Sequence, residues 1–214
     1  KRSRRCGVSS STLGATEPGD LQTGIDVPWL RVAEGVYEYQ GDDGVLHRRT
    51  EGLEGLQWDI ARIERTLAAE PEPGATADAE REAWIRSLIG HVMHLYALRT
   101  ALTSQSAAKA CMVTTLETAA TTTCPWGGPW ICGKADASYS GTCSASGYVY
   151  GYARGYNHPE HDDSQTAYGT SFTIGVLEAD WIYGDSCGFG YASIAGGGHY
   201  SSQQAEYPQG CHPY

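Results

Sequence analysis

Long hydrophobic runs are missing from this sequence of 214 residues. A helix that crosses a bilayer needs about 20 consecutive apolar residues. The longest apolar stretch here, from Leu88 to Leu98, is interrupted by His91 and His94. Such a stretch is typical of the buried face of a helix in a globular protein. We therefore expect no membrane span.

Positive charge is also scarce, because 15 Lys and Arg stand against 25 Asp and Glu, giving a formal net charge of −10 at pH 7. Proteins that bind nucleic acid neutralise phosphates with clustered Lys and Arg, and the only basic cluster here is residues 1–5. We therefore expect no nucleic-acid partner. No apolar core follows the cluster, so we interpret it as a flexible basic arm or the remnant of a processing site rather than an intact signal peptide.

Closely spaced cysteine pairs of the kind that hold zinc are absent, because the seven cysteines are dispersed along the chain. Dispersed cysteines in a chain with little Lys indicate disulfides formed in an oxidising compartment, so we predict a secreted, extracellular protein. Spacing alone does not choose among the possible pairings. Cys6 is free, pairs with another chain, or replaces one of the other six. Those six disulfide candidates are Cys111, Cys124, Cys132, Cys143, Cys187 and Cys211.

Helical patterns are absent from residues 1–48, where Gly and Pro recur too often for a helix. The alternation in Val36–Tyr39 favours a short strand, and Asp42–Gly44 is typical of a turn. We interpret the segment as an extended N-terminal arm that packs on the rest of the molecule.

Two helices are predicted within residues 49–123 from the spacing of apolar side chains. In residues 50–70 these side chains recur three and four positions apart, and Pro71 ends the pattern. The same spacing predicts a longer helix from Asp78 to Ala110. The short linker between them favours antiparallel neighbours. The apolar residues of the first helix are Leu53, Leu56, Ile60, Ile63 and Leu67.

Aliphatic side chains are few in residues 124–214, which instead hold most of the 14 Tyr and 27 Gly. Tyr148–Tyr152 and Thr170–Val176 alternate with a period of two, as antiparallel strands do. Disulfides, at about 2–4 kcal/mol each, would compensate for a thin core. The predicted fold class is α+β. An N-terminal antiparallel helical hairpin would precede a disulfide-stapled, Tyr/Gly-rich antiparallel β domain, built as a meander or a sandwich.

No strong catalytic motif is present, so the sequence leans away from an enzyme. Gly184–Gly188 resembles the nucleophile loop of trypsin-like serine proteases, but Cys187 stands where that family has Gly, and no suitable histidine motif lies upstream. We interpret this run as a turn that ends in a disulfide cysteine. Glu178 and Asp180 share one face of a predicted strand, and paired carboxylates serve glycoside hydrolysis. Nothing in the sequence indicates that this pair is buried.

One dense group of possible metal ligands occurs between residues 158 and 163. Imidazole and carboxylate groups together suit zinc or another divalent ion, whereas Pro159 and the surrounding polar residues also fit a solvated hairpin turn. His91 and His94 lack the HExxH spacing, so we interpret them as core or interface histidines. No other cofactor is expected. The candidate metal ligands are His158, Glu160, His161 and Asp162.

Excess apolar surface on the second helix and the tryptophans bear most directly on function. The apolar stripe of that helix is wider than one partner helix covers, so part of it meets the β domain, the arm or another chain. Trp126 and Trp130 lie on a tight loop if the cysteines at 124 and 132 pair. With Trp181 they form either a platform for sugar rings or part of the core. The predicted contact residues are Trp84, Leu88, His91, Leu95, Trp126 and Trp130.

These features together predict a secreted, bacterial-type structural or interaction protein. It would be a subunit of an extracellular assembly or filament, or a surface adhesion module. Its partners would be other protein chains, including copies of itself, or a glycan. Two alternatives are a carbohydrate-binding module and a secreted enzyme or toxin with a helical half that acts like a prodomain.

Overall fold

The computed structural model describes residues 29–69, 79–105, 111–155, 161–182 and 184–211, and this part of the chain is mostly β-strand. None of the helices described is long and apolar enough to cross a membrane. The strands are β1 (Leu30–Ala33), β2 (Val36–Gln40), β3 (Leu46–Glu51), β4 (Val113–Thr123), β5 (Trp130–Arg154), β6 (His161–Trp181), β7 (Cys187–Gly196) and β8 (His199–Tyr207). The helices are α1 (Gly52–Ala69) and α2 (Ala79–Gln105), which lie between β3 and β4 in the sequence.

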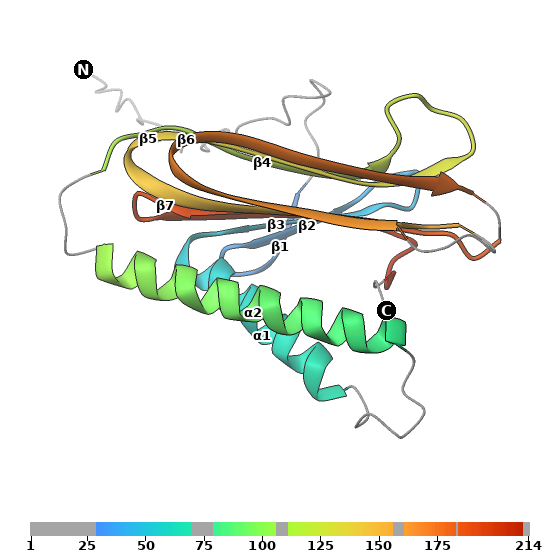
Figure 1. Cartoon of the computed structure of the whole chain (residues 1–214), viewed down its shortest axis with the longest axis horizontal. Helices are drawn as coiled ribbons and strands as arrows, with labels where there is room; N and C mark the ends of the chain where they lie inside the picture. Colours follow the sequence, from blue (N-terminus) through green and yellow to red (C-terminus); the bar gives the residue numbers. More distant parts are fainter. Residues whose placement is uncertain (1–28, 70–78, 106–110, 156–160, 183, 212–214) are drawn as a thin grey trace, which may run out of the picture.

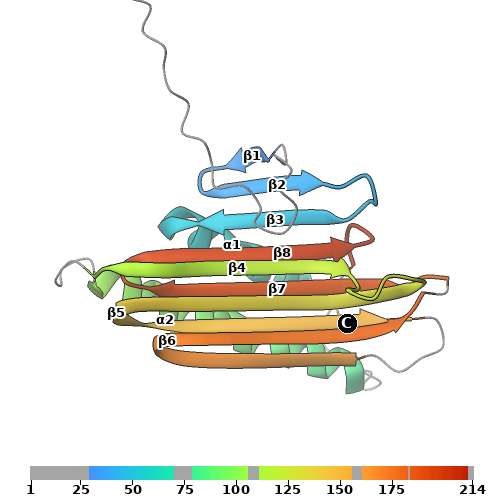
Figure 2. The same ribbon diagram turned by 90° about the horizontal axis from the view of Figure 1, so that it is seen from above.

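All these strands belong to one antiparallel sheet that curls over on itself (Figure 1). The order along the sheet is β1-β2-β3-β8-β7-β5-β4, and β6 pairs with β5. The first part of β5 pairs with β4 and β6, whereas the part from Ala145 onward pairs with β7 and β6. The β5–β6 hairpin changes register between Ser140 and Ala145 and curls there. Its halves therefore lie in two layers, with β4 above β8 and β7 (Figure 2).

The two layers approach closely because glycine faces the opposite backbone. A Cβ atom added to Gly133 of the first layer would lie 2.3 Å from backbone atoms of Tyr152 and Phe189 in the second. A Cβ atom added to Gly190 would lie 2.3 Å from the carbonyl oxygen of Lys134. A side chain at either glycine would overlap this backbone, so both positions need Gly. The rest of the space between the layers is filled by a buried cluster of Ala135, Ala137, Tyr139, Ala145, Val149, Val176, Ala192 and Ile194.

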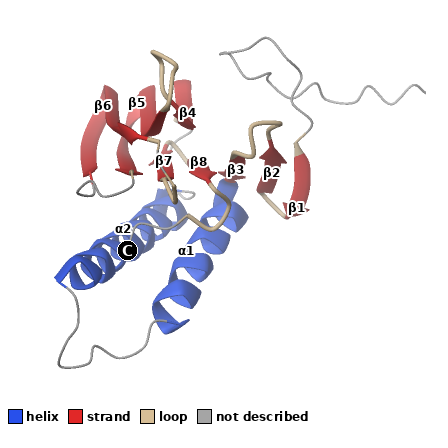
Figure 3. Cartoon of the chain, turned by 90° about the vertical axis from the view of Figure 1, so that its right-hand side faces the viewer, coloured by secondary structure: helices blue, strands red, loops and turns tan. Residues whose placement is uncertain are grey.

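The two helices cover the other face of the second layer (Figure 3). Apolar side chains at helical spacing on α1 and α2 meet Ala195 of β7 and Tyr200 of β8. Removing this apolar surface from water, at about 25 cal/mol per Å², holds the helices on the sheet. The buried cluster at this interface comprises Leu56, Ile60, Ile63, Val92, Leu95, Leu98, Leu102, Ala195 and Tyr200.

Three disulfides join the six cysteines of the second half. Cys111 pairs with Cys143 at the curl of β5, Cys124 pairs with Cys132 across the loop between β4 and β5, and Cys187 of β7 pairs with Cys211. Cys6 lies outside the described residues. The disulfides therefore fix both ends of the curled hairpin and the segment that follows β8.

The predicted fold class is wrong. The chain is mostly β, and it is not a helical hairpin followed by a β domain. Strands β1 to β3 come before the helices, and β3 pairs with β8, where Thr50 lies opposite Ser202. Residues interpreted as an extended arm are thus strands of the same sheet as the C-terminal strands. The boundary predicted at residue 48 falls inside β3, and the boundary at residue 123 falls at the end of β4.

Candidate functional site

Three tryptophan side chains meet at one end of the first layer, and we call them the tryptophan surface: Trp126, Trp130 and Trp181. Trp130 begins β5 and Trp181 ends β6, directly opposite each other in the strand register. Their ring centroids are 4.9 Å apart at an interplanar angle of 71°. The rings of Trp126 and Trp130 are 6.1 Å apart at 88°. Both pairs are therefore edge-to-face, an arrangement that the ring quadrupoles favour.

The short loop that carries Trp126 is closed by the disulfide between Cys124 and Cys132. Gly127 and Gly128 have φ angles of 66° and 81°, in the left-handed region that glycine adopts without strain. The amide of Gly127 donates a hydrogen bond to the carbonyl of Cys124. The loop therefore has a defined shape before any partner binds.

The tryptophan surface is wet although its side chains are large and apolar. Trp126 is 55% exposed and Trp181 is 46% exposed, and the neighbouring Ile182 is 40% exposed. The amide of Ile182 donates a 2.7 Å hydrogen bond to the carbonyl of Pro129, which connects the end of β6 to the loop. Contiguous exposed apolar groups of this kind mark contact sites on protein surfaces.

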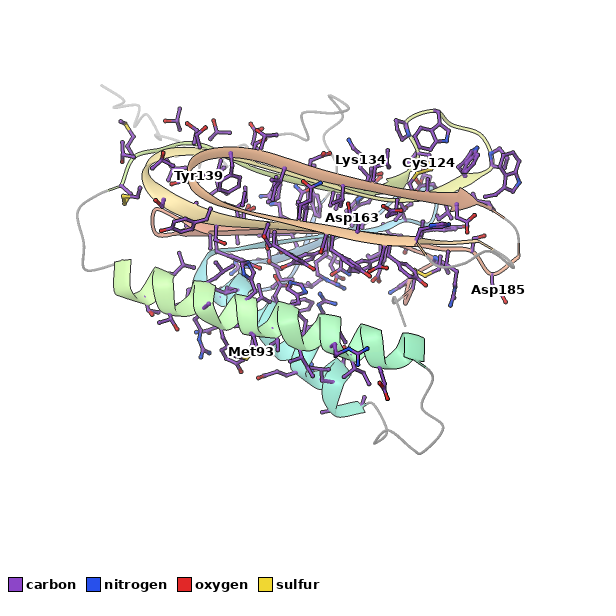
Figure 4. The ribbon with its side chains drawn as sticks, in the orientation of Figure 1. Met93, Cys124, Lys134, Tyr139, Asp163 and Asp185 are labelled. Atoms are coloured by element: carbon purple, nitrogen blue, oxygen red, sulfur yellow. A yellow bond between two sulfur atoms is a disulfide. The ribbon has the colours of Figure 1, made fainter. Side chains whose placement is uncertain are left out.

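Beside the tryptophans, the outer face of the first layer is polar and carries no helix (Figure 1). Lys134 lies on this face, close to Cys124 (Figure 4). Its Nζ is 2.8 Å from an Asp136 carboxylate oxygen, and both side chains are partly exposed. Further along the strands, the hydroxyls of Ser138 and Thr173 share a hydrogen bond of 3.2 Å. The face therefore offers hydrogen-bond donors and acceptors next to aromatic rings.

The two carboxylates singled out on β6 have different environments. Asp180 is buried and accepts hydrogen bonds of 2.6 Å from the amides of Gly155 and Trp181. It thereby fixes the backbone that presents the Trp181 ring. Burial raises the pKa of Glu178, and Asp163 adds to that rise while His161 opposes it. Asp180 is thus used within the fold, as the anchor of a strand end.

A second notable region is the buried interface between α2 and the second layer. The ring of His91 lies 4.5 Å from the ring of Tyr191 and 5.2 Å from that of Tyr148, and the ring of His94 lies 5.7 Å from that of Tyr148. Burial lowers the pKa of His91 to about 3, with smaller contributions from Arg62 and His94. Burial also lowers the pKa of His94. Both histidines are therefore neutral at pH 7.

Asp59 of α1 is the centre of a buried hydrogen-bond network beside these histidines. One of its carboxylate oxygens accepts hydrogen bonds from the hydroxyls of Thr50 at 2.6 Å, Tyr200 at 2.9 Å and Ser202 at 2.9 Å. The hydroxyl of Tyr200 in turn lies 3.2 Å from that of Tyr191. Burial, and then the Asp59 charge, raise the pKa of Tyr191 and Tyr200. The network joins α1 to β3, β7 and β8.

The predicted contact residues fall into two groups. Leu95 is fully buried, and Leu88 packs against the same cluster beneath the helices, so neither is a surface anchor in this fold. Trp84 lies on α2, but its side chain is outside the described residues. Trp126 and Trp130 do lie together on the surface, and the register of β5 and β6 adds Trp181 to them.

The candidate metal ligands are only partly described. His161 and Asp162 are exposed on β6, whereas His158 and Glu160 lie outside the described residues. Within the described part of the chain, no group of three or more His, Cys, Asp or Glu is placed to hold a metal ion. The metal site therefore stays a prediction. In the protease-like run, Ser186 is buried and the next residue, Cys187, is bonded to Cys211.

No protein-family model matches the chain, and neither the curated proteins nor the solved structures contain a significant match. The function must therefore be argued from the residues themselves.

Proposed function

We propose that the protein is a secreted interaction module that binds its partner on the tryptophan surface. The observation that carries this proposal is the exposure of Trp126 and Trp181 on a loop and a strand end that are both fixed within the fold. Tryptophan is among the side chains that contribute most to binding at protein contact sites.

The rigidity of the site favours binding. A loop closed by a disulfide and anchored by backbone hydrogen bonds loses little conformational freedom when a partner arrives, and this raises affinity. Three disulfides are also compatible with an extracellular protein, because such bonds persist in oxidising compartments. Secretion is part of the proposal.

The test compares the full chain with the double variant Trp126→Ala/Trp181→Ala on immobilised extracellular proteins and polysaccharides. We expect the wild type to bind at least one member of the panel and the double variant to bind it at least tenfold more weakly, because the main contact area is gone. Tyr168→Ala is the matched control, since Tyr168 is 79% exposed on β6 but belongs to no part of the tryptophan surface. Wild-type binding to nothing on the panel, or equal binding by the double variant, would contradict the proposal.

Assembly with further copies of the chain is the second candidate, and the outer side of α2 favours it. Ile89 is 47% exposed and Met93 is 62% exposed, and Met93 points away from the sheet (Figure 4). Gly90 lies beside them with nothing within 4 Å of a Cβ atom built on it, so a second α2 helix can approach closely. The occupant would be the same stripe of a second copy.

Sedimentation velocity over a range of concentrations in oxidising buffer tests the assembly function. We expect a concentration-dependent increase in mass that Met93→Glu abolishes, because the charge would lose its hydration in a helix–helix contact. Leu30→Glu is the control, since Leu30 is 68% exposed on β1, away from α2. A uniform monomer at every concentration would rule out self-assembly.

A further inference from the structure

We infer that the partner of the tryptophan surface is a neutral polysaccharide, which lies across the three indoles and onto the polar face of β4, β5 and β6. This inference rests on the proposed function and names the chemical class of its partner.

The aromatic part of the site fits the apolar faces of sugar rings. Neither of the two ring pairs stacks face to face, so the indoles do not bury their faces against one another in parallel. Trp126 and Trp181 keep about half of their surface exposed, on either side of Trp130 in the cluster. Flat aromatic faces bury the C–H groups of a pyranose ring and leave its hydroxyl groups at the rim.

The polar part of the site fits the hydroxyl groups of the same ligand. Lys134 and Asp136 form an ion pair on the outer face of β5, with their side chains 30% and 41% exposed. The pair provides both a donor and an acceptor for sugar hydroxyls. Lys134 is four residues along β5 from Trp130, which is about 13 Å at 3.3 Å per residue. That span suits several linked sugar units better than a single sugar.

The charge of the site excludes anionic polymers. Lys134 is neutralised by Asp136, and the net charge of the chain is −10. Burial and Asp163 favour the protonated form of Glu178 on the adjacent strand by raising its pKa, so this residue gives no cationic character. Polyanions such as acidic polysaccharides or nucleic acids would be repelled at long range. An uncharged chain meets no such barrier.

The surroundings of the indoles also favour a glycan over a protein. Protein interfaces are centred on an apolar core that a polar rim encloses. Here the indoles stand at the end of a sheet face whose other outward positions include Asp136, Ser138 and Thr173, with Leu177, 38% exposed, as an apolar exception. A strip of aromatic rings followed by hydrogen-bonding groups matches an elongated, hydroxyl-rich ligand.

Affinity electrophoresis of the full chain tests the inference, with hydroxyethyl cellulose, arabinoxylan and galactomannan as neutral probes and alginate and heparin as anionic probes. We expect retardation by at least one neutral polysaccharide and by neither anionic one. Trp126→Ala and Trp181→Ala should each weaken the retardation about tenfold, Lys134→Ala should weaken it a few-fold, and Tyr168→Ala should not change it. Unchanged thermal unfolding of each variant would show that the losses come from the site and not from misfolding.

The outcomes separate this inference from the function on which it rests. Binding to immobilised proteins that needs the tryptophans, with no retardation by any neutral polysaccharide, would overturn the inference and leave the interaction module intact. Retardation that is the same in the wild type and both tryptophan variants would overturn both. Retardation by alginate or heparin alone would overturn the choice of a neutral ligand.

Discussion

Strand β7 separates two interfaces that are packed by opposite means. Gly188, Gly190 and Ala192 face the first layer, where the backbones of the two layers lie within a side chain's width of each other. Between them, Phe189 and Tyr191 face the helices, where large rings fill the space. The first interface gains contact energy from close backbone approach, and the second from bulky side chains and a buried hydrogen-bond network. A sequence poor in aliphatic residues can therefore still build a dense core.

The largest expected effect breaks the first of these interfaces. In Gly133→Ala the new Cβ atom would lie 2.3 Å from the backbone of Tyr152 and Phe189, and neither backbone can move without shifting a strand. We expect the free energy of unfolding to fall by about 3 kcal/mol or more, measured by urea denaturation with the disulfides intact. Gly90→Ala is the control, because nothing lies within 4 Å of that position on α2. The control should gain about 0.5–1 kcal/mol from helix propensity. An unchanged urea midpoint for Gly133→Ala would mean that the layers are farther apart than described.

A smaller effect sharpens the comparison at the second interface, where pH acts on His91. The group has an ordinary pKa of 6.5 in the unfolded chain and about 3 in the fold, where Arg62 of α1, His94 of α2, Tyr148 and Tyr191 surround it. Between these values the unfolded chain binds a proton that the native chain does not, so stability falls as pH falls below 6.5. At about 1.4 kcal/mol per pH unit, the loss between pH 6.5 and pH 5 is about 2 kcal/mol.

His91→Phe should flatten this part of the stability profile, because Phe keeps the ring contacts and takes up no proton. The measurement is the free energy of unfolding from urea titrations between pH 5 and pH 7. His199→Phe serves as the control, since His199 is exposed at the start of β8 and should leave the profile unchanged. An equal slope in the wild type and His91→Phe would show that burial of His91 does not drive the acid sensitivity.

The same contrast explains which features could be predicted from sequence. Helix α1 follows from its apolar spacing, because a helix is a local structure that its own residues encode. The pairing of Thr50 with Ser202 joins segments about 150 positions apart in the chain, and no local pattern specifies such a partner. For that reason the first three strands were interpreted as an arm. The thin core was correctly noticed, but its remedy includes the close approach at Gly133 as well as the disulfides.

The candidate site divides in the same way. Trp126 and Trp130 could be predicted as neighbours, because the cysteines that flank them close a short loop. The position of Trp181 next to them depends on the register of β5 against β6, which the sequence does not reveal. Leu95 was expected at a contact surface because its stripe is apolar, but an apolar stripe looks alike whether a sheet of the same chain or another chain covers it.

The smallest expected effect separates aromatic residues that support the fold from those that bind. In Trp126→Ala the side chain removed is 55% exposed and lies on the disulfide-closed loop, so little buried surface is lost. We expect the free energy of unfolding to change by less than about 0.5 kcal/mol, although the same substitution should abolish most binding. Tyr152→Ala is the opposite case, because Tyr152 is 2% exposed in the cluster that includes Phe189 and Tyr191. Its loss should cost about 3–5 kcal/mol. Urea denaturation of both variants checks the difference, and a loss of several kcal/mol in Trp126→Ala would mean that the tryptophan surface belongs to the core after all.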